Sequence, residues 1–483
     1  MEAKQYERLP VSVLEKYTAP DREAVNRCFE EEYKDFCRKV VVLDDDPTGV
    51  QTVHGISVYT DWTYESLREG MEEEGGMFFV LTNSRSFSAQ ETEREHRLLA
   101  ARAVEAARDS DRELLLISRG DSTLRGHYPL EPEVLKEELE AGTGKKIHGQ
   151  ILCPYFQEGG RYTINSVHYV KEGEWLVPAG QTEFAKDKTF GYRSSHLGDY
   201  VEEKSGGRYR REDGIYITLD LLRGQKYDEI TRLLCAAENF QPVLVDAIAE
   251  CDVETFAVCL LRAMKAGKEF LIRSAAAVPK VLGNVGSRPL LTKEELISGD
   301  SGAAVYGGIV LIGSHVKKTT LQLEALMETK TPVRFLEFDV NTCFREGGLE
   351  AETKRMIREA EQAMGEGKTA VVYTSRTLLA PEGVDKEELL QLSVNISNAV
   401  TGVIAGLHRK PRFLIAKGGI TSSDVGTKAL KVRKAMVLGQ VQPGIPVWRT
   451  GPESKFPGLS YIIFPGNVGE VDTLKKIVEL MNN

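Results

Sequence analysis

The chain has 483 residues, of which 41% are hydrophobic and 28% are charged, and its formal net charge is -10. This length exceeds the roughly 100 to 200 residues of an ordinary domain, so we expect two or three domains. The acidic balance argues against a nucleic-acid partner. No apolar run approaches the roughly 20 residues that cross a bilayer, so we expect no membrane partner either.

The N-terminal segment and the cysteines indicate a cytoplasmic protein. Residues 1–38 are polar and acidic, contain no apolar core of signal-peptide length, and are typical of a helical extension. The seven cysteines are odd in number and include no C-x-x-C pair, which fits reduced thiols rather than a disulfide framework or a zinc site. We therefore assign no residue as a metal ligand.

The first strand ends in a run of carboxylates. Residues 40–43 (VVVL) are apolar and mostly β-branched, and Asp44, Asp45 and Asp46 follow before a Pro-Thr-Gly turn. Adjacent carboxylates repel one another, so a site that holds them needs a cation or a protonated member. Ligands bind at the carboxyl ends of strands in open α/β sheets, so the motif indicates metal-assisted chemistry on a small polar substrate. A solvated acidic turn is the alternative.

Polar residues also follow the next two buried strands. Residues 77–81 form an apolar strand that ends close to Arg85, and Ser88 with Glu91 forms a capping box that begins a helix reaching about residue 108. The strand at 114–117 is followed by a polar turn that contains Asp121, Ser122, Thr123 and Arg125. Because parallel strands end at one edge of a sheet, these turns are expected to lie together.

The remainder of the first half alternates strands with helical segments. Residues 171–213 are interpreted as a loop-like excursion close to the substrate. The other strands are expected at 55–60, 151–153, 215–219, 243–249 and 270–272. This alternation is typical of an α/β fold with a mostly parallel sheet covered on both faces.

A tract rich in Gly, Ser and Ala at 297–308 is typical of a linker, so we place a second α/β domain at 303–483 and the first at 39–290. The first strand of the second domain, 309–312, is followed by a helix that we expect to be capped by Thr319 with Gln322. Further strands are expected at 370–373, 413–416 and 461–464.

Three strand-to-turn junctions of the second domain contain glycine: GS at 313–314, GGIT at 418–421 and GNVG at 466–469. Glycine lets the backbone approach a ligand, and the helix that follows each turn favours a phosphate at its N-terminus. The three turns together predict a nucleotide site, although glycine after a strand also serves plain tight turns. Neither the P-loop nor the dinucleotide fingerprint occurs at them.

The first domain offers carboxylates, hydroxyls and cations for a polar substrate. Arginine grips a carboxylate or phosphate with two parallel hydrogen bonds, and an aspartate beside a hydroxyl can accept its proton during phosphoryl transfer. A surface or interdomain ion pair is the alternative role for each arginine. The cations are Arg85, Arg125 and Arg161.

The ordered set of motifs resembles the four-carbon acid sugar kinase family from about residue 40 to the C-terminus. The motifs are DDPTG at 45–49, DSTLRG at 121–126, GGRYTIN at 159–165, the GS turn, the GGIT loop and PGNVG at 465–469. The resemblance implies a sugar-acid-binding N-terminal domain and a nucleotide-binding C-terminal domain, with the active site in the cleft between them. It implies a transferase of carbohydrate metabolism that uses ATP and Mg²⁺ to phosphorylate the terminal hydroxyl of threonate, erythronate or 3-oxo-tetronate.

The resemblance also assigns residues. The ATP contacts of the family correspond to Ser314, Gly418, Gly419, Ile420, Thr421 and Gly466 in this sequence. Its sugar-acid site falls on Asp45, Asp46 and Asp121 as catalytic residues and on Arg85, Ser122 and Arg125 as substrate-binding residues. Arg85 or Arg125 would hold the carboxylate end of the acid, and one of the aspartates would address the accepting hydroxyl.

Two alternatives stay open. A haloacid dehalogenase-like phosphatase would use Asp44 as nucleophile and Asp46 as acid/base, but it leaves the glycine turns unexplained. A catalytically silent protein that binds nucleotide and sugar acid is suggested by Ile420, which stands where many family members have an acidic residue. Under each of these alternatives the expected partners are small molecules. The sequence is compatible with a homo-oligomer.

Overall fold

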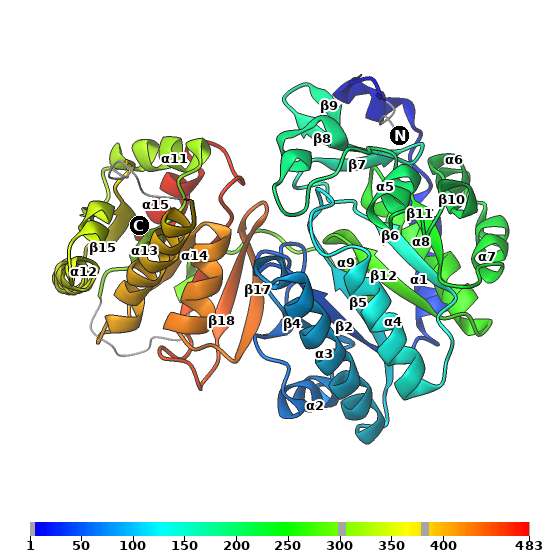
Figure 1. Ribbon diagram of the computed structural model, residues 1–483, viewed down its shortest axis with the longest axis horizontal. Coiled ribbons are helices and arrows are strands. Elements are labelled where there is room, and N and C mark those ends of the chain that lie inside the picture. The colour runs from blue at the N-terminus through cyan, green and yellow to red at the C-terminus, as the bar shows by residue number, and fades with distance from the viewer. Residues whose placement is uncertain (1–4, 298–305, 378–385, 483) are drawn as a thin grey trace. The chain divides into compact units, whose positions relative to one another are not determined.

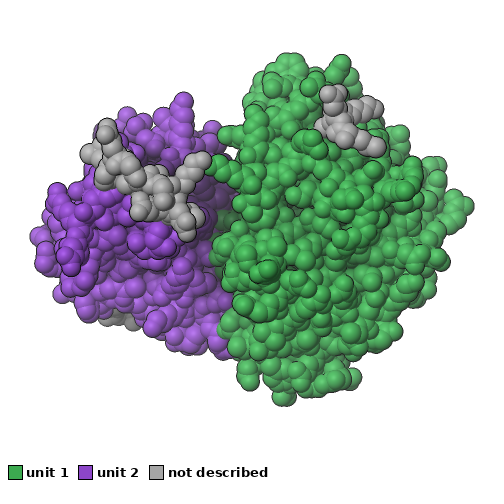
Figure 2. Space-filling view, viewed as in Figure 1, with its two compact units in different colours: residues 1–49, 61–286 green, residues 50–60, 287–483 purple. Residues whose placement is uncertain are grey.

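The computed structural model describes residues 5–297, 306–377 and 386–482, which form two compact units. Unit 1 comprises residues 1–49 and 61–286, and unit 2 comprises residues 50–60 and 287–483 (Figure 2). The expected domain start at 303 and most of the expected linker lie outside the described residues. Both units are α/β, so the predicted fold class is confirmed.

The main sheet of unit 1 is parallel throughout, with strand order β10-β11-β6-β12-β5-β2-β4. Each strand corresponds to an apolar run that the sequence predicts. The bounds are β2 Arg38–Asp44, β4 Met77–Leu81, β5 Glu113–Arg119, β6 Gly149–Cys153, β10 Ile215–Ile217, β11 Gln241–Val245 and β12 Phe270–Ser274. Their side chains are buried on both faces, as a sheet covered by helices requires.

The helices cover the two faces of this sheet according to the direction of each crossover. The connections from β4 to β5 and from β5 to β6 run one way along the sheet, whereas that from β11 to β12 runs the other way. Because such crossovers are right-handed, α3 and α4 lie on one face and α8 on the opposite face (Figure 1). Helix α2 packs beside α3, and α1 and α7 pack beside α8. The bounds are α1 Arg22–Tyr33, α2 Tyr64–Glu72, α3 Ala89–Asp109, α4 Leu130–Thr143, α6 Leu219–Arg223, α7 Tyr227–Cys235, α8 Glu250–Lys265 and α9 Ala277–Leu282.

The predicted N-cap at Ser88 is confirmed, whereas the loop-like character expected of residues 171–213 is wrong. The Ser88 side chain accepts a hydrogen bond from the Glu91 amide at the start of α3. Residues 171–213, expected to be loop-like, contribute to a small antiparallel sheet of order β1-β9-β8-β7 and to helix α5. The bounds are β1 Leu9–Pro10, β7 Arg161–Ile164, β8 Val167–Glu172, β9 Trp175–Pro178 and α5 Leu197–Lys204. A tight turn at Gly173, whose φ is +59°, joins β8 to β9, and this hairpin was hidden among polar residues. The N-terminal segment, expected to be a helical extension, contains helix α1 and also the two-residue strand β1.

The sheet of unit 2 has the order β3-β17-β18-β19-β16-β13-β15-β14. Strands β19, β16, β13, β15 and β14 run parallel, and β3, β17, β18 and β19 pair antiparallel. The bounds are β3 Ile56–Tyr59, β13 Ile309–Ile312, β14 Val333–Phe338, β15 Thr369–Thr374, β16 Leu414–Lys417, β17 Lys434–Gln442, β18 Ile445–Thr450 and β19 Ser460–Phe464. Strands β14, β17 and β18 were not predicted.

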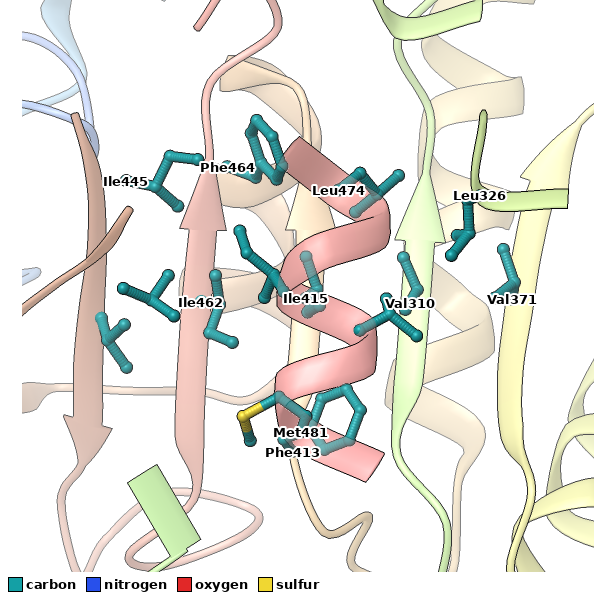
Figure 3. Close-up of a cluster of buried hydrophobic side chains, with 14 of the residues drawn as sticks. Val310, Leu326, Val371, Phe413, Ile415, Ile445, Ile462, Phe464, Leu474 and Met481 are labelled. Atoms are coloured by element: carbon teal, nitrogen blue, oxygen red, sulfur yellow. The ribbon is translucent and has the colours of Figure 1, made fainter. Parts of the chain in front are cut away.

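Helices α11 and α15 bury one face of this sheet. Figure 3 shows Leu474 and Met481 of α15 packed against sheet residues that include Val310, Ile415 and Ile462. The bounds are α10 Lys293–Ile297, α11 Lys317–Met327, α12 Gly348–Gly365, α13 Lys386–Gly406, α14 Gly419–Asp424 and α15 Thr473–Asn482. Across the described parts of both units, we find no helix with the length and apolar character needed to span a membrane.

Candidate functional site

The aspartates that follow β2 are neutralised by arginines. Arg119 Nη1 lies 3.2 Å from Asp44 Oδ1 and 3.7 Å from Asp45 Oδ1. Arg85 Nε lies 3.2 Å from Asp45 Oδ2, and its Nη2 lies 2.5 Å from Asp46 Oδ2. These guanidinium groups supply the positive charge that the run of carboxylates requires.

Asp121 joins this cluster from the turn after β5. Arg125 Nε donates to Asp121 Oδ2 at 2.7 Å, the Thr123 hydroxyl donates to the same oxygen, and Arg85 Nη1 lies 3.9 Å from Asp121 Oδ1. Burial alone would raise the pKa of Asp121, but Arg125 and Arg85 together hold it well below its usual range. Asp121 is therefore a fixed anion that orients the arginines.

Asp45 differs from its neighbours because both of its carboxylate oxygens are buried and accept no hydrogen bond from the described residues. Burial raises its pKa to about 6, against the opposing effect of Arg85. The pKa of Asp46 is lowered instead, since Arg85 and Thr48 outweigh its burial. Asp45 is thus a carboxylate that contacts arginines without accepting a hydrogen bond, and its raised pKa of about 6 suits a general base.

Asp44 is packed too tightly to act as a nucleophile. Its carboxylate is buried and bonded to Arg119, and a Cβ added at Gly49 would lie 1.8 Å from Asp44 Oδ2. A phosphoryl group on this aspartate would need the space that the Gly49 turn occupies. This geometry disfavours the haloacid dehalogenase-like alternative.

The turn that contains Asp121 is held by three buried side chains that the sequence analysis missed. Each of them donates a hydrogen bond to one of three consecutive backbone carbonyls: His168 Nε2 to Ser122 at 2.8 Å, Tyr192 to Thr123 at 2.6 Å and Tyr200 to Leu124 at 2.8 Å. Burial lowers the pKa of His168 to about 4, so this ring is neutral. The segment 161–204 therefore fixes the turn that contains Asp121, and the predicted residue Ser122 contributes its backbone carbonyl to these contacts.

A buried ion pair lies behind the cluster and was also missed. Arg273, at the end of β12, pairs with Glu131 of α4 and donates to Ser118 Oγ at 2.7 Å. The Ser84 hydroxyl donates to Glu131 Oε1 at 2.6 Å. Burial opposes ionisation of Glu131, but Arg273 lowers its pKa to about 2. A Cβ at Gly126, whose φ is +128°, would lie 2.7 Å from Arg273 Nη2, so this arginine requires the last glycine of the DSTLRG motif.

A small pocket opens beside these residues. Asp121, Arg125, Tyr200, Arg273 and Ser274 are among the side chains that line it. The Ser274 hydroxyl is buried and has no hydrogen-bond partner among the described residues. The pocket therefore presents two arginines, each paired with a carboxylate, and an unused hydroxyl to a small polar ligand.

In unit 2, the glycine turns approach one another closely. A Cβ at Gly313 would lie 2.4 Å from Thr421 Oγ1, and one at Gly418 would lie 3.1 Å from Ser314 Cβ. A Cβ at Gly466 would lie 3.4 Å from Ser314 Oγ. Gly418 has a φ of +120°, which side chains rarely adopt, so its conformation requires glycine. The structure thus brings together the sequence-predicted residues Ser314, Gly418, Thr421 and Gly466.

Thr319 joins two of these turns and does not cap α11 as expected. Helix α11 begins at Lys317 after Val316, so Thr319 lies in its first turn. Its hydroxyl contacts Ser314 Oγ at 3.2 Å and the Gly466 carbonyl at 3.3 Å. The hydroxyl is free to connect the turns because the helix begins three residues earlier than the capping pattern indicated.

The other two predicted nucleotide contacts lie at the start of α14. Gly419 begins this helix, and the Ile420 side chain is 73% exposed. Asp424, further along α14, is buried and pairs with Lys428 at 2.9 Å.

Lys417, at the end of β16, is a buried cation directly before the GGIT turn. Its Nζ donates to the Pro465 carbonyl at 3.1 Å and lies 3.7 Å from the centroid of the Phe464 ring. Burial, with a smaller contribution from Lys318, lowers its pKa from 10.5 to about 7. A lysine that follows an apolar strand was the signal for it in the sequence.

Replacing Lys417 by Met is expected to change the pH dependence of stability. Between about pH 7 and 10 the unfolded chain holds a proton on Lys417 that the folded protein lacks, so the free energy of unfolding of the wild type rises with pH. Relative to the variant, the wild type should gain about 1.4 kcal/mol per pH unit in this range. Denaturant titrations at several pH values measure this slope. Lys476→Met, at an exposed lysine of α15, is the matched control and should show no such slope. Parallel curves for Lys417→Met and the wild type would contradict the expectation.

Comparison with known families identifies both units. Residues 40–282 match the family model described as a sugar-binding N-terminal domain, and residues 309–474 match the one described as a nucleotide-binding C-terminal domain. The chain belongs to the four-carbon acid sugar kinase family. The resemblance seen in the sequence motifs is thereby confirmed. In this kinase family member, the aspartate-arginine cluster falls within the sugar-binding domain and the glycine turns within the nucleotide-binding domain.

Two solved structures, from Salmonella typhimurium and Haemophilus influenzae, share the fold of this family member. A proposed tRNA synthase from Salmonella typhimurium LT2 is 16% identical with a TM-score of 0.65, over 91% of this chain and 98% of that one. A DUF1537 protein from Haemophilus influenzae is 16% identical with a TM-score of 0.60, over 92% of this chain and all of its own. A Bordetella bronchiseptica DUF1537 protein, crystallised with citrate as a domain-swapped dimer, is 19% identical with a TM-score of 0.38, over 92% and 99% of the two chains. No curated protein matched the chain.

Proposed function

We propose that this protein is an ATP-dependent cytoplasmic kinase that phosphorylates the terminal hydroxyl of a four-carbon sugar acid, such as threonate, erythronate or 3-oxo-tetronate. The observation that carries the proposal is Asp45. It is a buried carboxylate with two unbonded oxygens and a pKa near 6, and it lies in a domain that binds sugars. Such a group fits the base that accepts a proton from a substrate hydroxyl.

The other residues of the cluster have supporting roles in this proposal. Asp46 and Asp121 stay ionised and hold Arg85 in place from two sides. The Arg85 guanidinium then offers positive charge next to Asp45, where negative charge develops on the accepting oxygen and on the transferred phosphoryl group.

The nucleotide fits the glycine turns of unit 2. Ser314, Gly418, Gly419, Ile420, Thr421 and Gly466 are proposed to contact ATP, because close backbone turns beside helix N-termini bind phosphates well. Mg²⁺ would neutralise phosphate charge when it is bound with ATP. Among the described residues, no group of three or more His, Cys, Asp or Glu side chains is arranged to hold a metal ion, so we assign Mg²⁺ no ligand from the protein.

The reaction is tested by measuring ADP release from Mg²⁺-ATP with a panel of threonate, erythronate and 3-oxo-tetronate isomers, and by locating the product phosphate with NMR. Turnover on one acid, with phosphate on its terminal oxygen, is the expected result. ATP binding without turnover on any acid of the panel would contradict the proposed reaction and favour the catalytically silent alternative.

A further inference from the structure

The arginines of the aspartate cluster and of the pocket are almost all paired with carboxylates of the protein. Each pair includes a contact of 3.2 Å or less, so its positive charge is compensated within the chain. The pairs are Arg85 with Asp46, Arg119 with Asp44, Arg125 with Asp121, and Arg273 with Glu131. A substrate carboxylate that bound one of these arginines would compete with an aspartate or glutamate already in place.

Arg161 is the exception. This residue begins β7, in the GGRYTIN motif, and its guanidinium has no ion pair within 4.0 Å and no hydrogen bond to any residue that the structure describes. Its Nε atom is nevertheless buried. The Arg161 Cζ lies 5.5 Å from the centroid of the Phe184 ring, and the Arg125 Cζ lies 5.2 Å from the same centroid. The unpaired guanidinium therefore contacts the same aromatic ring as Arg125, which lines the pocket.

An unpaired guanidinium in this setting is costly to the free protein. Burial disfavours a charge that no counter-ion compensates, and the nearby Arg125 adds like-charge repulsion. Burial and Arg125 accordingly lower the pKa of Arg161, and Asp121 only partly offsets them. An anionic ligand would remove this cost by supplying the missing negative charge, and the planar fork of arginine suits a carboxylate.

We propose that Arg161 binds the carboxylate of the substrate and so selects acids over neutral polyols of the same length. The inference rests on the proposed function in naming a sugar acid as the substrate. It reassigns the carboxylate from Arg85 and Arg125, which hold Asp45, Asp46 and Asp121 in place, to the one guanidinium near the pocket that has no carboxylate partner among the described residues.

The test is equilibrium binding of threonate and erythronate isomers, measured calorimetrically without ATP, to the wild type and to Arg161→Gln. The variant is expected to bind the preferred acid at least 100-fold more weakly. Erythritol and threitol, which lack a carboxylate, are expected to bind the two proteins alike. In turnover assays the loss is expected in KM for the acid, with KM for ATP unchanged. Arg161→Lys keeps the charge without the fork, and its affinity should fall between the two.

Thermal unfolding separates this role from a structural one. Removing a guanidinium without a partner is expected to leave the unfolding temperature of Arg161→Gln unchanged or to raise it, whereas loss of a structural ion pair would lower it. Arg193→Gln, at an arginine of the same unit whose side chain is 71% exposed, is the matched control and should bind the acids normally.

Different results would overturn the role assigned to Arg161 and the proposed kinase reaction. Acid binding by the wild type that is lost in Arg161→Gln supports the inference even if no phosphate is transferred, in which case the proposed reaction alone is wrong. Equal acid affinity in the two proteins, or no binding of any acid to the wild type, would overturn the role assigned to Arg161.

Discussion

Replacing Asp45 by Asn is expected to lower kcat about 100- to 10,000-fold, the range that positioned general bases contribute. Asn keeps the shape of the side chain but cannot accept the proton of the substrate hydroxyl. The Arg85 guanidinium keeps its contacts with Asp46 and Asp121, so ATP and the acid should still bind. Initial rates, together with calorimetric binding of both substrates, measure the two effects separately.

The same role fixes the direction of the pH dependence. Because burial raises the pKa of Asp45 to about 6, the proposed base is ionised at neutral pH and becomes protonated as the pH falls. The kcat of the wild type is therefore expected to fall about tenfold per pH unit below about pH 6, and the residual activity of Asp45→Asn should lack this limb. Asp111→Asn, at an exposed turn residue of the same unit, is the control and should behave as the wild type. A pH limb that survives in Asp45→Asn would assign the base elsewhere.

The strands that the sequence predicts are those buried on both faces. Residues 40–43 and 77–81 read as continuous apolar runs because helices cover both sides of the parallel sheet. Strand β17 alternates buried and half-buried or exposed residues and carries irregularities around Gly439, so its pattern is too weak to detect from the sequence. The β8–β9 hairpin was missed for a similar reason, since its polar turn dominates the segment.

The candidate site is predictable to the extent that strand ends converge. Asp45, Asp121, Arg85 and Arg125 were predicted from the turns that follow strands, and the structure brings them into one cluster. Their supports were missed because they come from other kinds of position. Glu131 lies in the first turn of a helix, where an acidic residue ordinarily needs no special explanation. Arg273 and Lys417 lie at the ends of apolar strands, and only the three-dimensional structure shows that their charged side chains are buried.

Replacing Glu131 by Gln is expected to lower the free energy of unfolding at neutral pH by about 3 to 5 kcal/mol, the usual cost of removing one partner from a buried ion pair. The variant leaves the Arg273 guanidinium buried without its carboxylate. Because Arg273 lowers the pKa of Glu131 to about 2, the stabilisation is complete above the unfolded pKa near 4.5 and is lost as the pH falls toward 2. Denaturant titrations along this pH range measure the difference between the two proteins.

Glu133→Gln is the matched control, two residues further along the same helix. Glu133 pairs with Arg208, whose side chain is 61% exposed, so its loss should cost no more than about 1 kcal/mol. Equal destabilisation by the two variants would show that the buried Glu131–Arg273 pair contributes no more to stability than the exposed pair.

The Glu131 variant should also change catalysis in a defined direction. Glu131 raises the pKa of Asp45, whereas Arg273 lowers it. With the carboxylate of Glu131 gone, the positive charge of Arg273 acts on Asp45 without compensation, so the pKa of the base falls and the acidic limb of kcat moves to lower pH. A stability loss without this movement would mean that the ion pair supports the fold alone. A loss accompanied by it would show that the buried pair also sets the proton affinity of the base.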